Sequence, residues 1–176
     1  DVTFDMFPSL YGSTRLTMLF PQWTMDGGPE KQKECLASDE ARLRLKYEMI
    51  PSGISYGDMW LTYFKNPRNH RFEGKSISEA ATLLGKDEID TMWDLLLDED
   101  LQVCYVMAST NGMTLPKFIN HPLSMIGSDG VLLGDFPSPR TYGAFPSVLG
   151  EFVREEKGMT LPDAIRKMTS FPAQRL

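Results

Sequence analysis

Hydrophobic and polar residues alternate along this chain with two different periods. Short runs rich in β-branched and aromatic residues predict strands at residues 2–7, 59–64, 101–107 and 123–126. Longer runs predict helices at 29–37, 39–49, 76–84, 87–97, 114–120, 147–156 and 161–168. Because strands and helices alternate at both ends of the chain, the pattern predicts an α/β fold.

Proline and glycine mark several expected boundaries. Pro8 ends the first predicted strand, and residues 9–14 are expected to form a polar loop after it. Pro29 lies at a helix start, and Gly85 is expected to end the helix that Ser76 or Ser78 opens. The Pro- and Gly-rich residues 134–146 precede the last two predicted helices.

The domain organisation follows from this pattern. We expect residues 1–24 to form a strand and its loop, and residues 98–176 to hold the last strand and the closing helices. Residues 25–97 are mostly helical in character. We therefore expect them to be an insertion between two sheet or barrel units.

Asp129 is the strongest candidate for an active-site residue. It follows the short strand 123–126, which is apolar on both faces and suits a buried parallel sheet. Polar residues just beyond the carboxyl ends of such strands face the active sites of α/β proteins. The alternative is an Asx-turn, in which the carboxylate caps its own loop, and spacing alone favours that turn.

Other polar residues carry weaker signals. Tyr11, Ser13 and Arg140 follow predicted strands and could bind an anionic or amide ligand, although such residues are more often simply exposed. Two histidines, His70 and His121, are too few for a zinc site of this chain's own.

The composition of the chain argues against some classes of function. The 176 residues carry 24 acidic and 18 basic side chains, a net charge of -6, which argues against nucleic-acid binding. No apolar run is long enough to span a membrane, so no membrane partner is expected. With only two cysteines and no visible signal peptide, a reducing, cytoplasmic location is the expectation.

Several motifs resemble one enzyme family. They are His121-Pro122, Ser128-Asp129-Gly130, the segments 139–145, 161–170 and 172–176, and the upstream segments 1–8 and 12–14. Together they resemble the C-terminal barrel portion of the N-acyl-D-amino-acid deacylases (D-aminoacylases), in the metal-dependent amidohydrolase superfamily.

The resemblance implies a fold. Residues 2–7 and 123–126 would be strands seven and eight of a TIM-type (β/α)8 barrel, and residues 25–97 would be a lid over the active site. The chain would then be part of a longer amidohydrolase, and the missing N-terminal portion of the barrel would be its partner.

The resemblance also implies a function. It predicts a zinc-dependent hydrolase that cleaves the amide bond of N-acyl-D-amino acids or a related N-acyl substrate. Asp129 would be the general acid/base and a metal ligand, with the other ligands outside this chain. Tyr11, Ser13 and Arg140 would contact the substrate, and the chain alone would be inactive.

Three departures from the family pattern keep other functions open. Ser9, Ala108 and Ser138 stand where the family has other residues. They allow a metal-free, amidohydrolase-like fragment. A small-molecule-binding α/β domain without catalysis is a further alternative.

Overall fold

The computed structural model describes residues 2–49, 55–108 and 112–176, which form two compact units. Unit 1 comprises Asp1–Gly12, Ala108–Leu132 and Pro137–Leu176, and unit 2 comprises Ser13–Met107 and Leu133–Phe136. Strands and helices alternate in the chain, so the α/β class is confirmed. Residues 50–54 of the expected insertion and residues 109–111 lie outside the described residues.

The described elements follow in chain order. The strands are β1 (Phe4–Met6), β2 (Tyr11–Arg15), β3 (Met59–Tyr63), β4 (Cys104–Ala108) and β5 (Ser124–Ile126). The α-helices are α1 (Gly28–Leu36), α2 (Asp39–Met49), α3 (Ile77–Leu84), α4 (Glu88–Asp98), α5 (Leu115–Ile119), α6 (Arg140–Ser147), α7 (Leu161–Met168) and α8 (Ser170–Ala173). Short 3₁₀ helices are η1 (Leu16–Leu19), η2 (Gln22–Thr24), η4 (Tyr56–Asp58) and η5 (Pro67–Phe72), and η6 (Val148–Glu155) is a π-helix. None of the described helices is both long and apolar enough to cross a membrane.

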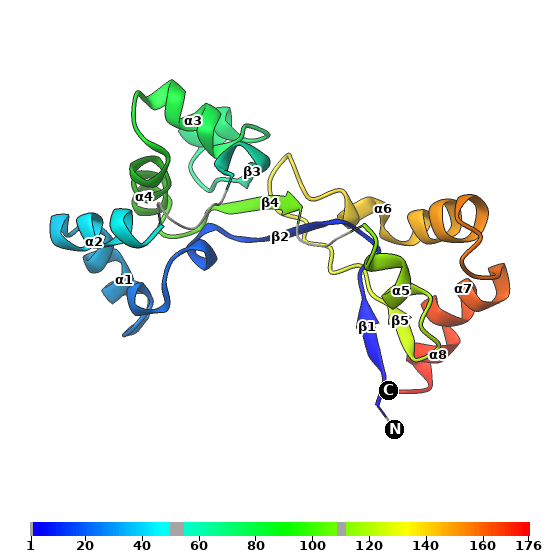
Figure 1. Ribbon diagram of the computed structural model, residues 1–176. Coiled ribbons are helices and arrows are strands. Elements are labelled where there is room, and N and C mark those ends of the chain that lie inside the picture. The colour runs from blue at the N-terminus through cyan, green and yellow to red at the C-terminus, as the bar shows by residue number, and fades with distance from the viewer. Residues whose placement is uncertain (1, 50–54, 109–111) are drawn as a thin grey trace. The chain divides into compact units, whose positions relative to one another are not determined.

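Unit 1 is organised around a parallel pair of strands. β1 and β5 lie side by side, with Phe4 opposite Ser124 and Met6 opposite Ile126 (Figure 1). Helices α5, η6 and α7 cover this pair through one apolar cluster. Its buried members are Leu115, Ile119, Ile126, Val148, Phe152 and Ala164. The parallel pairing places the residues that follow both strands at one edge of the sheet.

Unit 2 has a larger core of its own. Its sheet has the order β2-β4-β3, with β3 and β4 antiparallel. The largest buried side chains are aromatic, namely Trp93, Phe64 and Phe72. The Trp93 indole donates to the Leu36 carbonyl, so its polar atom is satisfied inside the core. Aromatic burial on this scale dominates the apolar stabilisation of a small unit.

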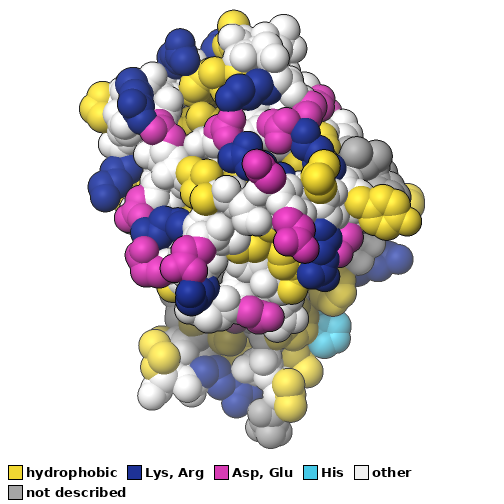
Figure 2. Space-filling view, turned by 90° about the vertical axis from the view of Figure 1, so that its left-hand side faces the viewer, with side chains coloured by type: hydrophobic (Ala, Val, Ile, Leu, Met, Phe, Trp, Pro, Cys, Tyr) yellow, Lys and Arg dark blue, Asp and Glu magenta, His cyan; other side chains and the backbone are white. Residues whose placement is uncertain are grey.

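Charged side chains cover unit 2 outside this core. Asp90 and Asp94 of α4 pair with Lys46 and Arg42 of α2 at 2.5 and 2.8 Å. Figure 2 shows cationic and anionic side chains intermixed over this face. Partly exposed pairs of this kind contribute little individually, so apolar packing carries the stability of the unit.

The local signals at helix α3 are confirmed. The Ser76 hydroxyl accepts from the Glu79 N–H at 3.1 Å, and the Glu79 carboxylate accepts from the Ser76 N–H at 2.7 Å. This reciprocal capping box satisfies two donors at the helix start. Gly85 ends the helix at φ 65°, a left-handed conformation that glycine adopts without a Cβ penalty.

Two local expectations are wrong. The expected loop 9–14 is in large part strand β2, because pairing beside β4 outweighs the weak strand propensity of its Gly and Ser residues. The stretch 134–146 holds the start of α6, seven residues before the expected helix at 147. Pro146 lies inside α6, where it cannot donate the regular backbone N–H, and the chain continues as the π-helix η6.

A buried carboxylate lies directly after the last residue of α4. Glu99 is 1% exposed, and its Oε2 accepts from the N–H groups of Lys65 and Asn66 at 2.6 and 2.8 Å. The Asn69 side-chain amide donates to the other oxygen of Glu99. The carboxylate therefore satisfies three donors, two in the segment between β3 and η5 and one in η5. Hydrogen bonds to a charged acceptor are among the stronger ones in proteins.

We predict that Glu99→Ala destabilises unit 2. Loss of the acceptor leaves buried N–H groups unsatisfied, which should lower the free energy of unfolding by about 2–4 kcal/mol. The control, Glu40→Ala, removes an exposed carboxylate from α2 and should change it by less than about 0.5 kcal/mol. Chemical denaturation of the protein containing this chain measures both values, and equal values for the two variants would contradict the assignment.

Candidate functional site

The candidate site lies in unit 1, at the edge where β1 and β5 end. Because the strands are parallel, Phe7 and Pro8 follow β1 at the same edge where Gly127 and Asp129 follow β5. The Gly127 N–H donates to the Met6 carbonyl at 3.1 Å and extends the pairing beyond the strand. The sheet thus brings together two loops that are far apart in sequence.

Asp129 has a left-handed backbone, with φ 46°. Aspartate tolerates this region better than most residues, but it needs support from its surroundings. Within this loop, the Ser128 hydroxyl accepts a hydrogen bond from the Gly130 N–H at 3.3 Å. The Asp129 side chain is 60% exposed, and its carboxylate pairs with Arg140.

Arg140 connects the two loops at this edge of the sheet. It is only 3% exposed, although it carries a permanent charge. Its Nη2 lies 2.6 Å from Oδ2 of Asp129, and its Nε donates to the Asp129 carbonyl at 2.8 Å. Nη1 donates to the Tyr11 carbonyl at 3.3 Å, and the guanidinium stands 4.4 Å from the centre of the Phe7 ring. One buried cation therefore joins the segment after β1 to the loop after β5.

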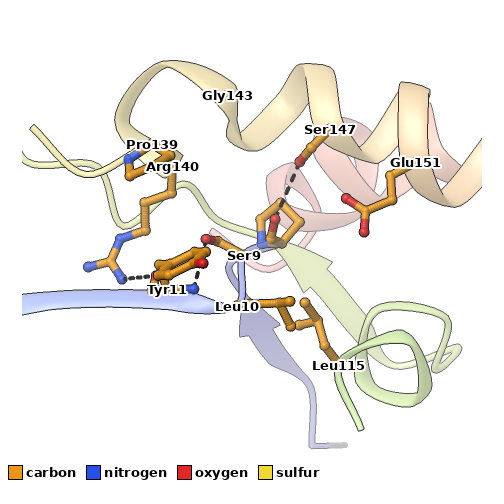
Figure 3. Close-up of a pocket in the computed structure, with 10 residues that line it drawn as sticks. Ser9, Leu10, Tyr11, Leu115, Pro139, Arg140, Gly143, Ser147 and Glu151 are labelled. Carbon is orange, nitrogen blue, oxygen red and sulfur yellow. Dashed lines mark hydrogen bonds between the residues drawn. The ribbon is translucent and has the colours of Figure 1, made fainter. Parts of the chain in front are cut away.

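A pocket of about 250 Å³ opens beside Arg140. It is lined by Pro8, Ser9, Leu10 and Tyr11, by Leu115, and by Pro139, Arg140, Gly143, Ser147 and Glu151 (Figure 3). Burial raises the pKa of the Glu151 carboxyl, and repulsion from Glu156 and Glu155 adds to the shift. The pocket thus has a cationic and a carboxylic group among mainly apolar neighbours.

Three of the four predicted site residues lie together. Asp129, Arg140 and Tyr11 belong to unit 1, and Arg140 contacts the other two. Ser13 belongs to unit 2, and its role stays a prediction. Their catalytic and substrate-binding roles also stay predictions.

Sequence reasoning missed two residues of the site. Phe7 supplies the ring beside the guanidinium, and its position as an aromatic residue at the end of a predicted strand is the signal that could have identified it. Glu151 lies in the helical segment after α6, and no local pattern distinguishes it from a surface glutamate. Ser138 is buried, and its hydroxyl has no hydrogen-bond partner among the described residues.

The described residues do not by themselves form a metal site. Outside residues 1, 50–54 and 109–111, no three His, Cys, Asp or Glu side chains gather closely enough to hold an ion. Zinc sites in proteins use three or four protein ligands. Asp129 has an exposed carboxylate at the sheet edge, and its role as a metal ligand stays a prediction.

Curated proteins that are similar to this chain include two deacylases. No family model matches the chain. An N-acyl-D-glutamate deacylase from Alcaligenes xylosoxydans xylosoxydans is 43% identical over 101 residues, which are 57% of this chain and 20% of that protein. An N-acyl-D-aspartate deacylase from the same organism is 32% identical over 95 residues, 51% of this chain and 19% of that protein.

A solved structure supports the same relationship. The N-acyl-D-glutamate deacylase from Bordetella bronchiseptica, in complex with zinc and a phosphonate mimic of the tetrahedral intermediate, matches with a TM-score of 0.69 and 25% identity. The match covers 99% of this chain and 28% of that one. The chain resembles the D-aminoacylases. The inferred resemblance is thus confirmed, and the structure of the Bordetella deacylase contains zinc, the metal that the resemblance implies. The chain spans about a fifth of the length of the curated relatives.

We predict that the close approach of the Asp129 loop to α6 depends on Gly130. A Cβ on Gly130 would lie 3.1 Å from the Thr141 Cα, whereas one on Gly143 meets nothing within 4 Å. Gly130→Ala should therefore lower the free energy of unfolding by about 1–3 kcal/mol. Gly143→Ala should be neutral or stabilising by up to about 1 kcal/mol, because alanine favours a helix interior. Denaturation curves test the pair, and an unaffected Gly130 variant would refute the contact.

Proposed function

We propose that this chain supplies the proton-transfer residue of a metal-dependent hydrolase that cleaves the amide bond of N-acyl-D-amino acids. One observation carries the proposal. The Asp129 carboxylate is exposed at the carboxyl edge of a parallel strand pair and is held there by a buried arginine. Similarity to deacylases of N-acyl-D-glutamate and N-acyl-D-aspartate supports the substrate class.

The chemistry needs one group that first takes and then gives a proton. Water adds to the carbonyl carbon, and the Asp129 carboxylate accepts the proton that this water loses. The protonated carboxyl then donates to the amide nitrogen as the carbon–nitrogen bond breaks, which releases the amine and the carboxylate product. General acid–base catalysis of this kind contributes about 10²–10⁴-fold to a rate.

We propose that residues outside this chain supply most of the ligands of a zinc ion. A bound zinc ion lowers the pKa of water and polarises a carbonyl. Since no three His, Cys, Asp or Glu side chains gather closely enough among the described residues, we propose Asp129 as one ligand and further ligands from the rest of a barrel. In that barrel, β1 and β5 correspond to the last two strands, and their parallel pairing is the arrangement that neighbouring barrel strands adopt.

Polar groups near Asp129 suit an anionic substrate. N-Acyl-amino acids carry a carboxylate, which hydroxyl and guanidinium groups can bind. We propose Tyr11 and Arg140 of unit 1, and Ser13 of unit 2, as substrate contacts. Residues 25–97 are proposed to act as the lid.

We predict that Asp129→Asn lowers turnover by about 10²–10⁴-fold in the complete protein, because the amide can neither accept nor donate the proton. Circular dichroism should show an unchanged fold. Asp135→Asn, at an exposed carboxylate of unit 2, is the matched control and should keep full turnover. Hydrolysis of N-acetyl-D-glutamate measures both variants. Normal turnover of Asp129→Asn would remove this residue from the mechanism.

Metal removal gives a separate test. We expect a chelator to abolish hydrolysis by the complete protein, and added zinc to restore it. The isolated 176-residue chain should bind zinc weakly and show no hydrolysis. Full activity in the presence of a strong chelator would favour a metal-free function instead.

A further inference from the structure

The loop that contains Asp129 continues into a short segment of unit 2. Residues Leu133–Phe136 belong to that unit, whereas Asp129 and the residues up to Leu132 belong to unit 1. Residues 130–132 are all that separates Asp129 from this segment. Because four peptide units span at most about 14 Å, the place where Leu133–Phe136 is held limits where the Asp129 backbone can lie. The contacts that hold this segment therefore bear on the proposed proton-transfer residue.

Glu73 joins the segment to the residue that follows strand β3. Its Oε2 accepts from the Asp135 N–H at 3.3 Å, and its Oε1 accepts from the Phe64 N–H at 3.3 Å. Phe64 is 1% exposed and belongs to the apolar core of unit 2. Hydrogen bonds to a carboxylate are stronger than those between neutral groups. One carboxylate thus attaches the segment to the core of unit 2.

Two glycines let the segment lie directly against its neighbours in unit 2. A Cβ on Gly134 would lie 2.7 Å from the Thr62 carbonyl oxygen, which is too close for a side chain to be accommodated without movement. A Cβ on Gly74 would lie 3.1 Å from the Phe136 ring. Both glycines have left-handed backbones, with φ 69° and φ 76°. Close packing therefore holds the segment in addition to the Glu73 hydrogen bonds.

We propose that Glu73 is a positioning residue, which fixes the far end of the Asp129 loop on unit 2 and so keeps the Asp129 carboxylate where it transfers the proton. This inference rests on the proposed function of Asp129. Glu73 acts through the backbone of residues 130–136, so its loss should lower kcat and leave KM unchanged. A residue that contacts the substrate would instead raise KM.

The competing explanation is that Glu73 only stabilises unit 2. A destabilised unit lowers the amount of folded protein, and that loss of rate persists whichever residue stands at position 129. A displaced loop, by contrast, costs nothing further once the Asp129 carboxylate has been removed. Combining each variant with Asp129→Asn therefore separates the two roles.

The experiment uses the complete protein and N-acetyl-D-glutamate. Gly134→Ala places a methyl group against the Thr62 carbonyl and should displace the segment, while the Glu73–Phe64 hydrogen bond stays intact. We expect this variant to lower kcat by about 10–100-fold with KM unchanged, since a small misplacement of a catalytic group has a cost of this size. Glu73→Ala should lower kcat to a similar extent.

Each variant has a matched control in unit 2. Gly85→Ala places alanine at a similar left-handed angle, φ 65°, but its Cβ meets nothing within 4 Å. Glu40→Ala removes an exposed carboxylate from α2. Both controls should keep normal kcat, because Glu73 and Gly134 remain in place.

Hydrogen exchange measures the anchoring of the segment without reference to activity. The Asp135 N–H loses its acceptor in Glu73→Ala and should exchange faster than in Glu40→Ala. Equal exchange in the two variants shows that Glu73 does not hold the segment, and overturns the inference.

Slow turnover of Glu73→Ala and Gly134→Ala at unchanged KM, with no further loss in the Asp129→Asn background, supports the positioning role. A raised KM, or a loss that adds to that of Asp129→Asn, overturns it. If Asp129→Asn is slow but Gly134→Ala is normal, only the positioning role fails. If Asp129→Asn is normal, the proposed function fails and this inference with it.

Glu73→Gln keeps the test decisive if the alanine variants do not fold. Its amide has one acceptor oxygen in place of two, so it can satisfy either the Asp135 or the Phe64 N–H but not both. A lower kcat at unchanged KM, which disappears in the Asp129→Asn background, supports positioning. A normal kcat overturns the inference.

Discussion

The parallel pairing of β1 with β5 is the constraint on which unit 1 depends. It joins segments that are more than a hundred residues apart and fixes Phe4 against Ser124 and Met6 against Ile126. In a parallel pair, both carboxyl ends meet at one edge, and the loops that follow must meet there too. The apolar cluster that packs on this pair, which includes Ile126 and Phe152, shields the pairing from water. The candidate site is a consequence of that geometry.

The buried charge of Arg140 connects the loops at the edge where β1 and β5 end. An arginine that is 3% exposed is costly unless its donors are satisfied, and Arg140 meets this cost with carbonyl and carboxylate acceptors and an aromatic ring. Lys167 is a second buried cation whose donors are satisfied, and it lies at the start of β5. Its ammonium is buried and donates to the Ser124 hydroxyl at 2.7 Å and to the Ser124 carbonyl at 3.1 Å. Two buried cations thus anchor the two ends of one short strand.

The two units differ in what they bring to function. Unit 2 has the aromatic core around Trp93 and a surface of paired charges, which are features of a stable scaffold. Unit 1 has the exposed carboxylate, the buried arginine and the pocket beside them. The similarity to deacylases spans nearly the whole chain in structure, while the chain spans less than a third of that relative. Under the proposed function, the catalytic residues would be divided between this chain and further residues.

The sequence alone determined most elements and the position of Asp129. Capping residues such as Ser76 and Gly85, and the apolar run before Gly127, act within a few residues, so their effects can be predicted locally. Strand β2, the early start of α6, and the roles of Phe7 and Glu151 depended on the tertiary structure. They arise from contacts between residues distant in sequence. A local pattern contains no information about which distant group satisfies a hydrogen bond or stacks on a ring.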